Sequence, residues 1–301
     1  MIAPETAQGV RVSKARTESR ARTEINVWRG SRQLLIDAAG LAVAAIMLFP
    51  IYWMVSTALK PGRDILTLTP KWYPSPFTLQ NFQNAITRPY FIDDVRNSLT
   101  IVGVMLVLAL AVGFLAAVGA ARFGFRGRTA YLVMIIGVQM VPLNSLIIPL
   151  YLALDSVGQV DALPGVIAIY LAAVLPFMIW TLRGFVANIP VELEESAMID
   201  GTTRLGAFFR ITFPLVAPGL VATAIFASIQ AWNEYIIAYV VLSSPQNQTL
   251  TIWLASFTTN HGPEWGPLMA GATLIGLPVV AFFLLLQRYL VGGLTAGSVK
   301  G

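Results

Sequence analysis

The sequence contains no cysteine, and His261 is its only histidine. Without cysteine, the chain has no disulfide, no thiol chemistry and no thiolate metal ligand. A cluster of histidine ligands is also excluded within a single chain, so we expect no metal site. His261 by itself is typical of a solvated loop residue.

Nucleotide-binding and hydrolytic motifs are missing as well. No G-x-x-x-x-G-K-[ST] sequence occurs, and no lysine stands in that context: Lys14, Lys60, Lys71 or Lys300. Neither a nucleophile elbow nor a zinc helix motif is present. We therefore predict that the chain is not an enzyme. Any ATP-driven activity would need a separate subunit that binds ATP.

Charged residues are scarce. They make up 12% of the 301 residues, whereas hydrophobic residues make up 56%, and the mean hydropathy is +0.70. This composition indicates a polytopic membrane protein in contact with lipid. The net charge of +5 lies on loops and a tail, so membrane topology explains it better than a nucleic-acid partner does.

Six apolar runs each reach about 20 residues, the length that a bilayer core requires. They predict an all-α polytopic membrane protein with six transmembrane helices, near 34–58, 97–121, 130–153, 163–186, 219–242 and 268–290. The basic residues 1–32 are expected to form a disordered cytoplasmic tail. Residues 33–292 are expected to form one transmembrane domain, followed by a cytoplasmic tail at 293–301.

The distribution of lysine and arginine predicts the orientation of the chain. Of 20 such residues, 15 lie in the two tails and in the segments on the same side as the tails. The other 5 lie on the opposite side: Lys60, Arg63, Lys71, Arg88 and Arg96. By the positive-inside rule both termini are cytoplasmic, and so is the segment 187–218.

The most polar segment between two apolar runs is 189–214. Pro190 suits the first position of a helix, and Gly201 suits its C-terminal cap. Three acidic side chains near the helix start favour the positive end of its dipole: Glu192, Glu194 and Glu195. A second short helix is expected from Thr202 or Thr203 to Pro214.

Three interpretations of this bent helix pair are open. It could be an ordinary polar loop, an amphipathic helix lying on lipid, or a docking element for a soluble protein. Acidic side chains are poor partners for an anionic cytoplasmic leaflet, so the docking element is favoured over the lipid-bound helix.

The segment also resembles the EAA motif of ABC importer permeases: E-A-A, three residues, G, nine residues, then I-x-L-P. The spacing is the same in Glu195-Ser196-Ala197, Gly201 and Ile211-Thr212-Phe213-Pro214. Ser196 and Phe213 are mild departures from the family pattern. Further similarity to the carbohydrate, maltose-type branch is carried by Leu193-Glu194, Ile199-Asp200, Asn81-Phe82, Asn97-Ser98-Leu99 and the terminus 287–301.

This resemblance, which covers residues from about 34 to 301, implies a permease subunit of an importer in the bacterial plasma (inner) membrane. Helices at about 190–214 would couple it to an ATPase through Glu194, Glu195, Ser196, Ala197, Asp200, Gly201, Ile211 and Pro214. The implied partners are a second related permease, two ATPase subunits that bind ATP and Mg²⁺, and an extracytoplasmic solute-binding protein. The implied substrate is a sugar or an oligosaccharide.

Polar residues inside the apolar runs are candidates for the substrate pathway. On one expected helix, Gln230, Asn233 and Glu234 share a face beside aromatic residues. Amides, a carboxylate and aromatic rings suit sugar hydroxyls and sugar ring faces. A second polar group, Gln139 and Asn144, flanks Pro142, where a kink is expected. In both places, hydrogen bonding between helices is the alternative.

Two rival functions follow from the residues alone. A proton-coupled secondary transporter would use Glu234 as its relay, but it would need internal repeats and more ionisable groups within the membrane. A membrane scaffold without transport activity is disfavoured by the polar faces within two spans. Dependence of uptake on ATP or on a proton gradient distinguishes the transporters.

Overall fold

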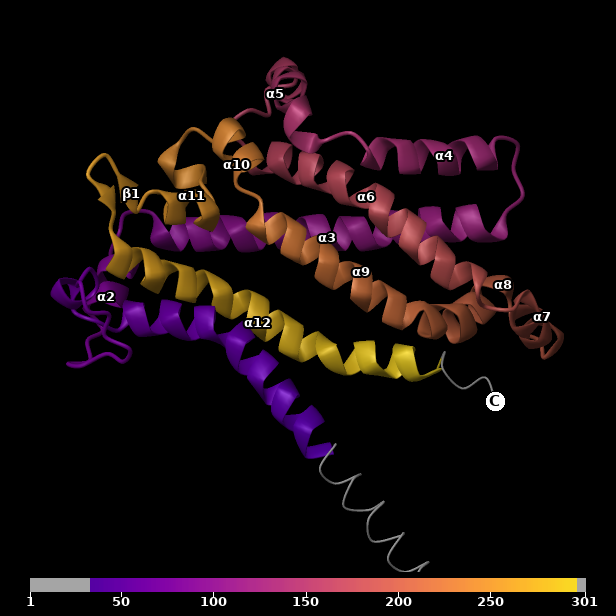
Figure 1. The fold of residues 1–301 in the computed structure, drawn as a ribbon. Helices are drawn as coiled ribbons and strands as arrows, with labels where there is room; N and C mark the ends of the chain where they lie inside the picture. The colour runs from indigo at the N-terminus through magenta and orange to yellow at the C-terminus, as the bar shows by residue number, and fades with distance from the viewer. Residues whose placement is uncertain (1–32, 297–301) are drawn as a thin grey trace, which may run out of the picture. The chain divides into compact units, whose positions relative to one another are not determined.

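A computed structural model describes residues 33–296, so the predicted tail at 1–32 and residues 297–301 lie outside the described residues. The chain forms two compact units, Met1–Ser56 and Thr57–Gly301. Figure 1 shows an almost wholly helical chain, which confirms the predicted all-α class.

The elements follow one another in the order below. They are α1 (Gln33–Ala58), η1 (Gly62–Asp64), α2 (Gln80–Ile86), α3 (Phe91–Arg122), α4 (Arg128–Gln139), η2 (Leu143–Leu146), α5 (Ile147–Ser156), α6 (Leu163–Ala187), α7 (Val191–Ile199), α8 (Arg204–Ala207), the π-helical η3 (Phe208–Thr212), α9 (Phe213–Asn233), α10 (Ile236–Val241), η4 (Pro245–Asn247), α11 (Leu250–Ala255), the antiparallel strands β1 (Thr258–Thr259) and β2 (Gly262–Pro263), and α12 (Trp265–Ala296).

Five helices are long and apolar enough to cross a membrane, and one bent pair of helices makes a sixth candidate span. The six predicted spans are therefore found, although several ends differ. α3 begins at Phe91 rather than near residue 97. α12 continues to Ala296, so the predicted tail at 293–301 begins inside a helix.

In the first unit, α1 is an apolar helix whose side chains are exposed along most of its length. The rings of Phe49 and Trp53, one turn apart, have centroids separated by 6.0 Å. Its length and hydropathy are those of a membrane span.

The third predicted span, 130–153, is broken rather than merely kinked. α4 and the following η2–α5 segment meet at 90°. Pro142 has an extended backbone, with ψ of 122°, and a proline also disfavours helical geometry at the preceding residue. The expected kink at Pro142 is confirmed, and it is a right-angled turn.

The fifth predicted span, 219–242, is wrong in position. One helical stretch runs from Arg204 to Asn233, through α8, η3 and α9. The second short helix therefore does not stop at Pro214, because this proline lies in the first turn of α9, where its missing N–H costs little. Apolar composition continues past Asn233, but the backbone becomes extended at Glu234, with ψ of 124°.

The core of the second unit lies where α3, α6 and α9 pack side by side (Figure 1). Met105, Met178 and Val216 are completely buried there. Close approach requires small residues: a Cβ on Gly219 would lie 2.6 Å from the Phe185 ring. The small residues expected to favour packing also lie on α3, and Ala117 is fully buried.

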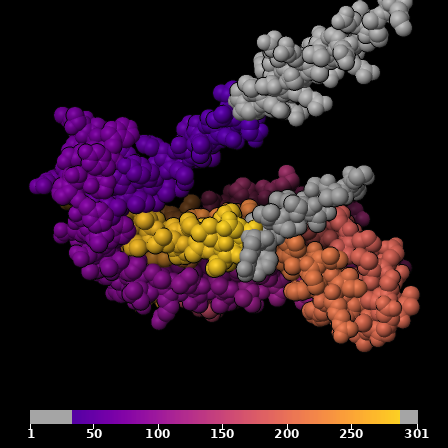
Figure 2. Space-filling model, turned by 90° about the horizontal axis from the view of Figure 1, so that it is seen from below, coloured from indigo at the N-terminus to yellow at the C-terminus, as the bar shows by residue number. Residues whose placement is uncertain are grey.

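The two ends of this bundle carry different elements. α7 and α8 lie at one end, whereas α10, α11 and β1 lie at the other (Figure 1). α12 packs against α2 near that second end, and Figure 2 shows the yellow surface of α12 beside the purple segment that contains α2. The segment with the EAA spacing and the breaks in the outer elements are therefore far apart along the bundle.

Candidate coupling site and substrate pathway

Helix α7 has a well-defined end. Pro190 is the residue just before the helix, one position earlier than expected. Gly201 adopts a left-handed backbone, with φ of +90°. Its N–H donates to the Met198 carbonyl, and the Thr202 N–H donates to the Ala197 carbonyl, both at 3.1 Å. These two bonds form a Schellman motif, so the predicted cap at Gly201 is confirmed.

The inner side of α7 is polar at one point. The Glu194 carboxylate lies 2.9 Å from a guanidinium nitrogen of Arg122 at the end of α3. The Thr212 hydroxyl donates to the same carboxylate oxygen. A second nitrogen of Arg122 donates to the Ile189 carbonyl at 3.0 Å. Glu194 therefore faces its own bundle, and sequence analysis had not identified Arg122 as its partner.

The outer side of α7 is open. Glu195, Ser196 and Asp200 are exposed. Ile199 is 85% exposed and Leu205 of α8 is 72% exposed. Large apolar side chains among exposed acidic ones are typical of a surface that contacts another protein.

The remaining EAA-type residues lie around this surface. Ala197 and Ile211 are half-buried, whereas Pro214 is exposed. In place of a second separate helix, Thr203 starts α8 by accepting a hydrogen bond from the Gly206 N–H at 3.1 Å. α8 then continues into the span, so a displacement of the segment 190–214 would move α9 directly.

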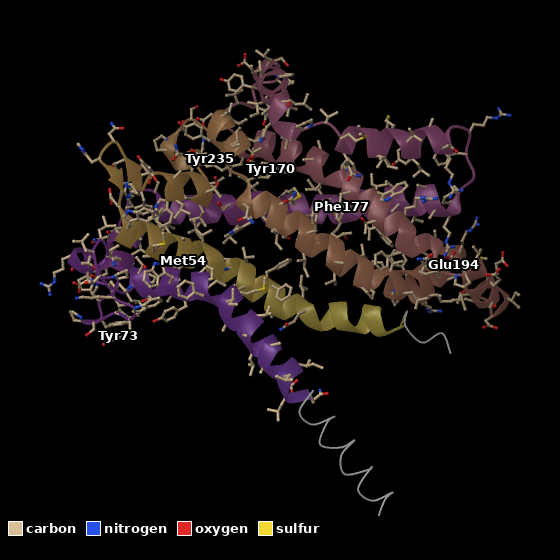
Figure 3. The ribbon with its side chains drawn as sticks, in the orientation of Figure 1. Met54, Tyr73, Tyr170, Phe177, Glu194 and Tyr235 are labelled. Atoms are coloured by element: carbon tan, nitrogen blue, oxygen red, sulfur yellow. The ribbon has the colours of Figure 1, made fainter. Side chains whose placement is uncertain are left out.

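A cavity of about 460 Å³ lies between the broken α4–α5 span, α6 and α9. Gln139 and Gln230, both predicted pathway residues, line it together. The rings of Phe177 and Phe226 form part of its wall, with centroids 4.0 Å apart, and Figure 3 shows Phe177 midway along the bundle. This volume lies within the range typical of small-molecule sites. Amides beside aromatic rings can bind hydroxyls and stack on a sugar ring.

Two other predicted pathway residues do not line this cavity. Asn144 is exposed on η2, because the right-angled turn at Pro142 separates it from Gln139. The Asn233 side chain donates to the Ile229 carbonyl in its own helix, at 2.9 Å. The structure therefore brings together only part of the predicted polar set.

Glu234 is not on a helical face with Gln230, because α9 has already ended. Its carboxylate accepts from the N–H groups of Ile237 and Ala238, at 3.0 and 3.2 Å, and so caps α10. The Tyr170 hydroxyl donates to it at 2.8 Å. Figure 3 shows Tyr170 and Tyr235 close together in this region. The carboxylate that sequence analysis placed in the pathway thus has a structural role.

Polar side chains at the same end hold the outer loops, and sequence analysis missed these roles. The Asn97 amide donates to the carbonyls of Gln246 and Gln248, both at 2.9 Å. The Ser98 hydroxyl accepts from the Leu250 N–H at 2.8 Å. The similarity of Asn97-Ser98-Leu99 to the maltose-type branch was the available signal, but it did not indicate these contacts.

Asp161 ties the link between α5 and α6 to the loop that follows α10. Its carboxylate accepts from the N–H groups of Ser243 and Ser244, both at 2.9 Å, and from the Ser244 hydroxyl. Burial opposes ionisation, but these hydrogen bonds outweigh it and hold the pKa of Asp161 below its ordinary value. Within residues 33–296, no group of three or more histidine or acidic side chains is placed to hold a metal ion.

Comparison with known proteins identifies several relatives. The diacetylchitobiose uptake system permease protein DasC of Streptomyces coelicolor is 42% identical over 85% of this chain and 92% of its own length. The trehalose transport system permease protein SugB of Mycobacterium tuberculosis is 35% identical, with coverage of 86% and 94%. The trehalose/maltose permease protein MalG of Thermococcus litoralis is 31% identical, with coverage of 90% and 98%.

A solved structure has the same fold. A bacterial ABC transporter involved in the import of the acidic polysaccharide alginate contains a chain that matches with a TM-score of 0.73 and 20% identity, covering 85% of this chain and 95% of that one. The family described as "Binding-protein-dependent transport system inner membrane component" matches residues 79–295. The chain therefore belongs to this family of multi-pass inner membrane proteins, the non-enzymatic permease subunits of ABC importers.

Proposed function

We propose that this permease imports a sugar or an oligosaccharide. The names of its relatives support this substrate class, since they refer to diacetylchitobiose, trehalose and maltose. The cavity lined by Gln139 and Gln230, with Phe177 and Phe226 in its wall, supplies the matching chemistry. Sugar hydroxyls would bond to the two amides, and a sugar ring would stack on an aromatic face.

The proposed assembly contains a second related permease, two ATPase subunits that bind ATP and Mg²⁺, and an extracytoplasmic solute-binding protein. α7 lies on the cytoplasmic side with both chain termini, as the excess of basic residues there supports. Its exposed face, with Glu195, Asp200 and Ile199, docks in a groove of an ATPase subunit.

The proposed mechanism is mechanical. Closure of the ATPase pair on ATP moves the grooves that hold α7 and α8, and the permease switches from inward-facing to outward-facing. One observation carries this proposal: the helix with the EAA spacing is exposed on one side and joined through α8 and η3 to the fifth span on the other.

The test uses the complete importer reconstituted in proteoliposomes, with a panel of sugars and the solute-binding protein. We expect one sugar class to stimulate ATP hydrolysis and to accumulate inside. Uptake should stop when the ATPase subunit is inactivated, and it should continue when the proton gradient is collapsed. Uptake that follows the gradient instead of ATP would contradict the proposal.

A proton-coupled mechanism through Glu234 has no support in the structure. That carboxylate caps α10 and accepts a hydrogen bond from Tyr170, so it is engaged in holding two helices. The comparisons also give no reason to retain it.

A further inference from the structure

We propose that Arg122, Glu194 and Thr212 form a latch that fixes the coupling helix α7 to the transmembrane bundle. The latch transmits movement into the bundle, whereas the outer face of α7 serves for docking. Glu194 is then a positioning residue rather than a contact for the ATPase. This inference rests on the proposed function, since it concerns how the same helix transmits force.

A single carboxylate oxygen joins three elements. Oε1 of Glu194, on α7, lies 2.9 Å from the Arg122 guanidinium at the end of α3. The same oxygen accepts from the Thr212 hydroxyl at the end of η3. Arg122 also donates to the Ile189 carbonyl, just before α7, at 3.0 Å. The latch therefore contacts α7, the residue that leads into it, α3 and the start of the fifth span.

The latch is shielded from solvent. The side chains of Arg122 and Glu194 are each 13% exposed, and Thr212 is fully buried. A shielded ion pair is weakened little by water and salt, and removal of one partner leaves an uncompensated charge. Arginine also suits the site, because its planar fork bonds Glu194 and the Ile189 carbonyl at once, which lysine cannot reproduce.

Aromatic packing supports the polar contacts. The Phe114 ring of α3 lies 5.6 Å from the Phe208 ring and 5.7 Å from the Phe213 ring, between centroids. Both partners flank Thr212 in sequence. α3 and η3 are thus joined on an apolar side as well, and π-helical segments such as η3 are frequent at functional sites.

The element that receives the movement is long. α3 contains 32 residues, which corresponds to about 48 Å of helix. Near its opposite end, Asn97 holds the carbonyls of Gln246 and Gln248. A displacement of α7 that is passed to Arg122 therefore reaches the outer loops through one continuous helix.

Not every charge near α7 takes part. Glu192, on the first turn of α7, is exposed, and so is Arg126, four residues beyond Arg122. Both keep their charge in solvent, where single ion pairs contribute little. They provide matched controls: a glutamate on the same helix and an arginine in the same turn.

The experiment measures uptake per ATP hydrolysed by the complete importer in proteoliposomes, together with association of the ATPase subunit by pull-down. For Arg122→Gln and Glu194→Gln we expect normal association and continued ATP hydrolysis. Uptake per ATP should fall on the order of tenfold, the size of a typical coupling between sites. Arg122→Lys should recover part of it, and Glu192→Gln and Arg126→Gln should not change it.

The outcomes separate this inference from the proposed function. Loss of ATPase association in Glu194→Gln would make Glu194 a docking residue and would overturn the latch. Unchanged uptake per ATP would overturn it too. If Arg122→Gln fails to assemble, Thr212→Val decides, because it removes only one hydrogen bond and must still lower uptake per ATP. Gly201→Trp tests docking itself: if association and uptake survive it, the proposed docking role of α7 fails independently of the latch.

Discussion

Single polar side chains in this protein mostly satisfy backbone groups of distant segments. Asn97 bonds the carbonyls before α11, Asn81 bonds the carbonyls of Ala58 and Lys60, and Asp161 bonds the N–H groups after α10. Each contact removes an unpaired backbone group at the place where a loop leaves the bundle. Asp161 does so from a left-handed backbone, with φ of 57°, which aspartate and asparagine tolerate better than most residues.

Asp161 gives a prediction about pH. Its folded-state pKa lies below the ordinary value of about 3.9. Its charge therefore adds stability above pH about 3.9, and this stability is lost as the pH falls through the lower, folded-state pKa. Asp161→Asn keeps the shape and tolerates the backbone, so it should lower the thermal midpoint at pH 7. The difference from the unmodified importer should shrink below pH about 3.9.

Thermal unfolding of the detergent-solubilised importer, followed by tryptophan fluorescence at several pH values, measures this difference. Asp155→Asn is the control, because Asp155 is exposed on α5 near the same loop. A difference between Asp161→Asn and the unmodified protein that does not vary with pH would show that the charge is not responsible.

At the scale of elements, the breaks in the spans are as informative as the spans. The turn at Pro142 separates α4 from α5 and opens the wall in which Gln139 and Gln230 meet. The end of α9 at Asn233 turns the Glu234 carboxylate onto the first N–H groups of α10. These are the positions where an uninterrupted apolar pattern would predict a continuous helix.

The cap on α10 is expected to depend on Tyr170. Tyr170→Phe removes the hydroxyl that donates to Glu234 and should destabilise the protein by about 1 kcal/mol, a usual size for one hydrogen bond. Tyr239→Phe is the matched control, because Tyr239 is 59% exposed. Unfolding of both variants in mixed detergent micelles measures the two losses. Equal losses would mean that the hydrogen bond adds nothing.

For the whole molecule, orientation decides whether the proposed mechanism is possible. α7 and Glu194 lie at one end of the bundle, and Tyr170 and Tyr235 lie toward the other (Figure 3). The proposed function needs the Glu194 end in the cytoplasm, where ATP is available. The same orientation places the loop 243–248 outside, within reach of a solute-binding protein.

Cysteine labelling can test this orientation cleanly, because the chain has no cysteine of its own. We expect a membrane-impermeant maleimide to label Gln246→Cys in intact cells. It should label Glu192→Cys only after the membrane is permeabilised. Both positions are exposed in the structure, so access to the reagent is not limiting. The reverse pattern would exclude docking of α7 to a cytoplasmic ATPase.

The sequence by itself determined the membrane class, the six spans, the EAA spacing and the cap at Gly201. These features depend on local properties: transfer of apolar runs into lipid and hydrogen bonds between near neighbours in the chain. Only the tertiary structure decided which way Glu194 faces, that Arg122 and Thr212 meet it, and that Glu234 caps a helix instead of lining a pathway. Arg122 and Glu194 are far apart in sequence, and no helical period links them. Their contact follows from how α3 packs beside the other helices, because that packing brings the two charges together away from solvent.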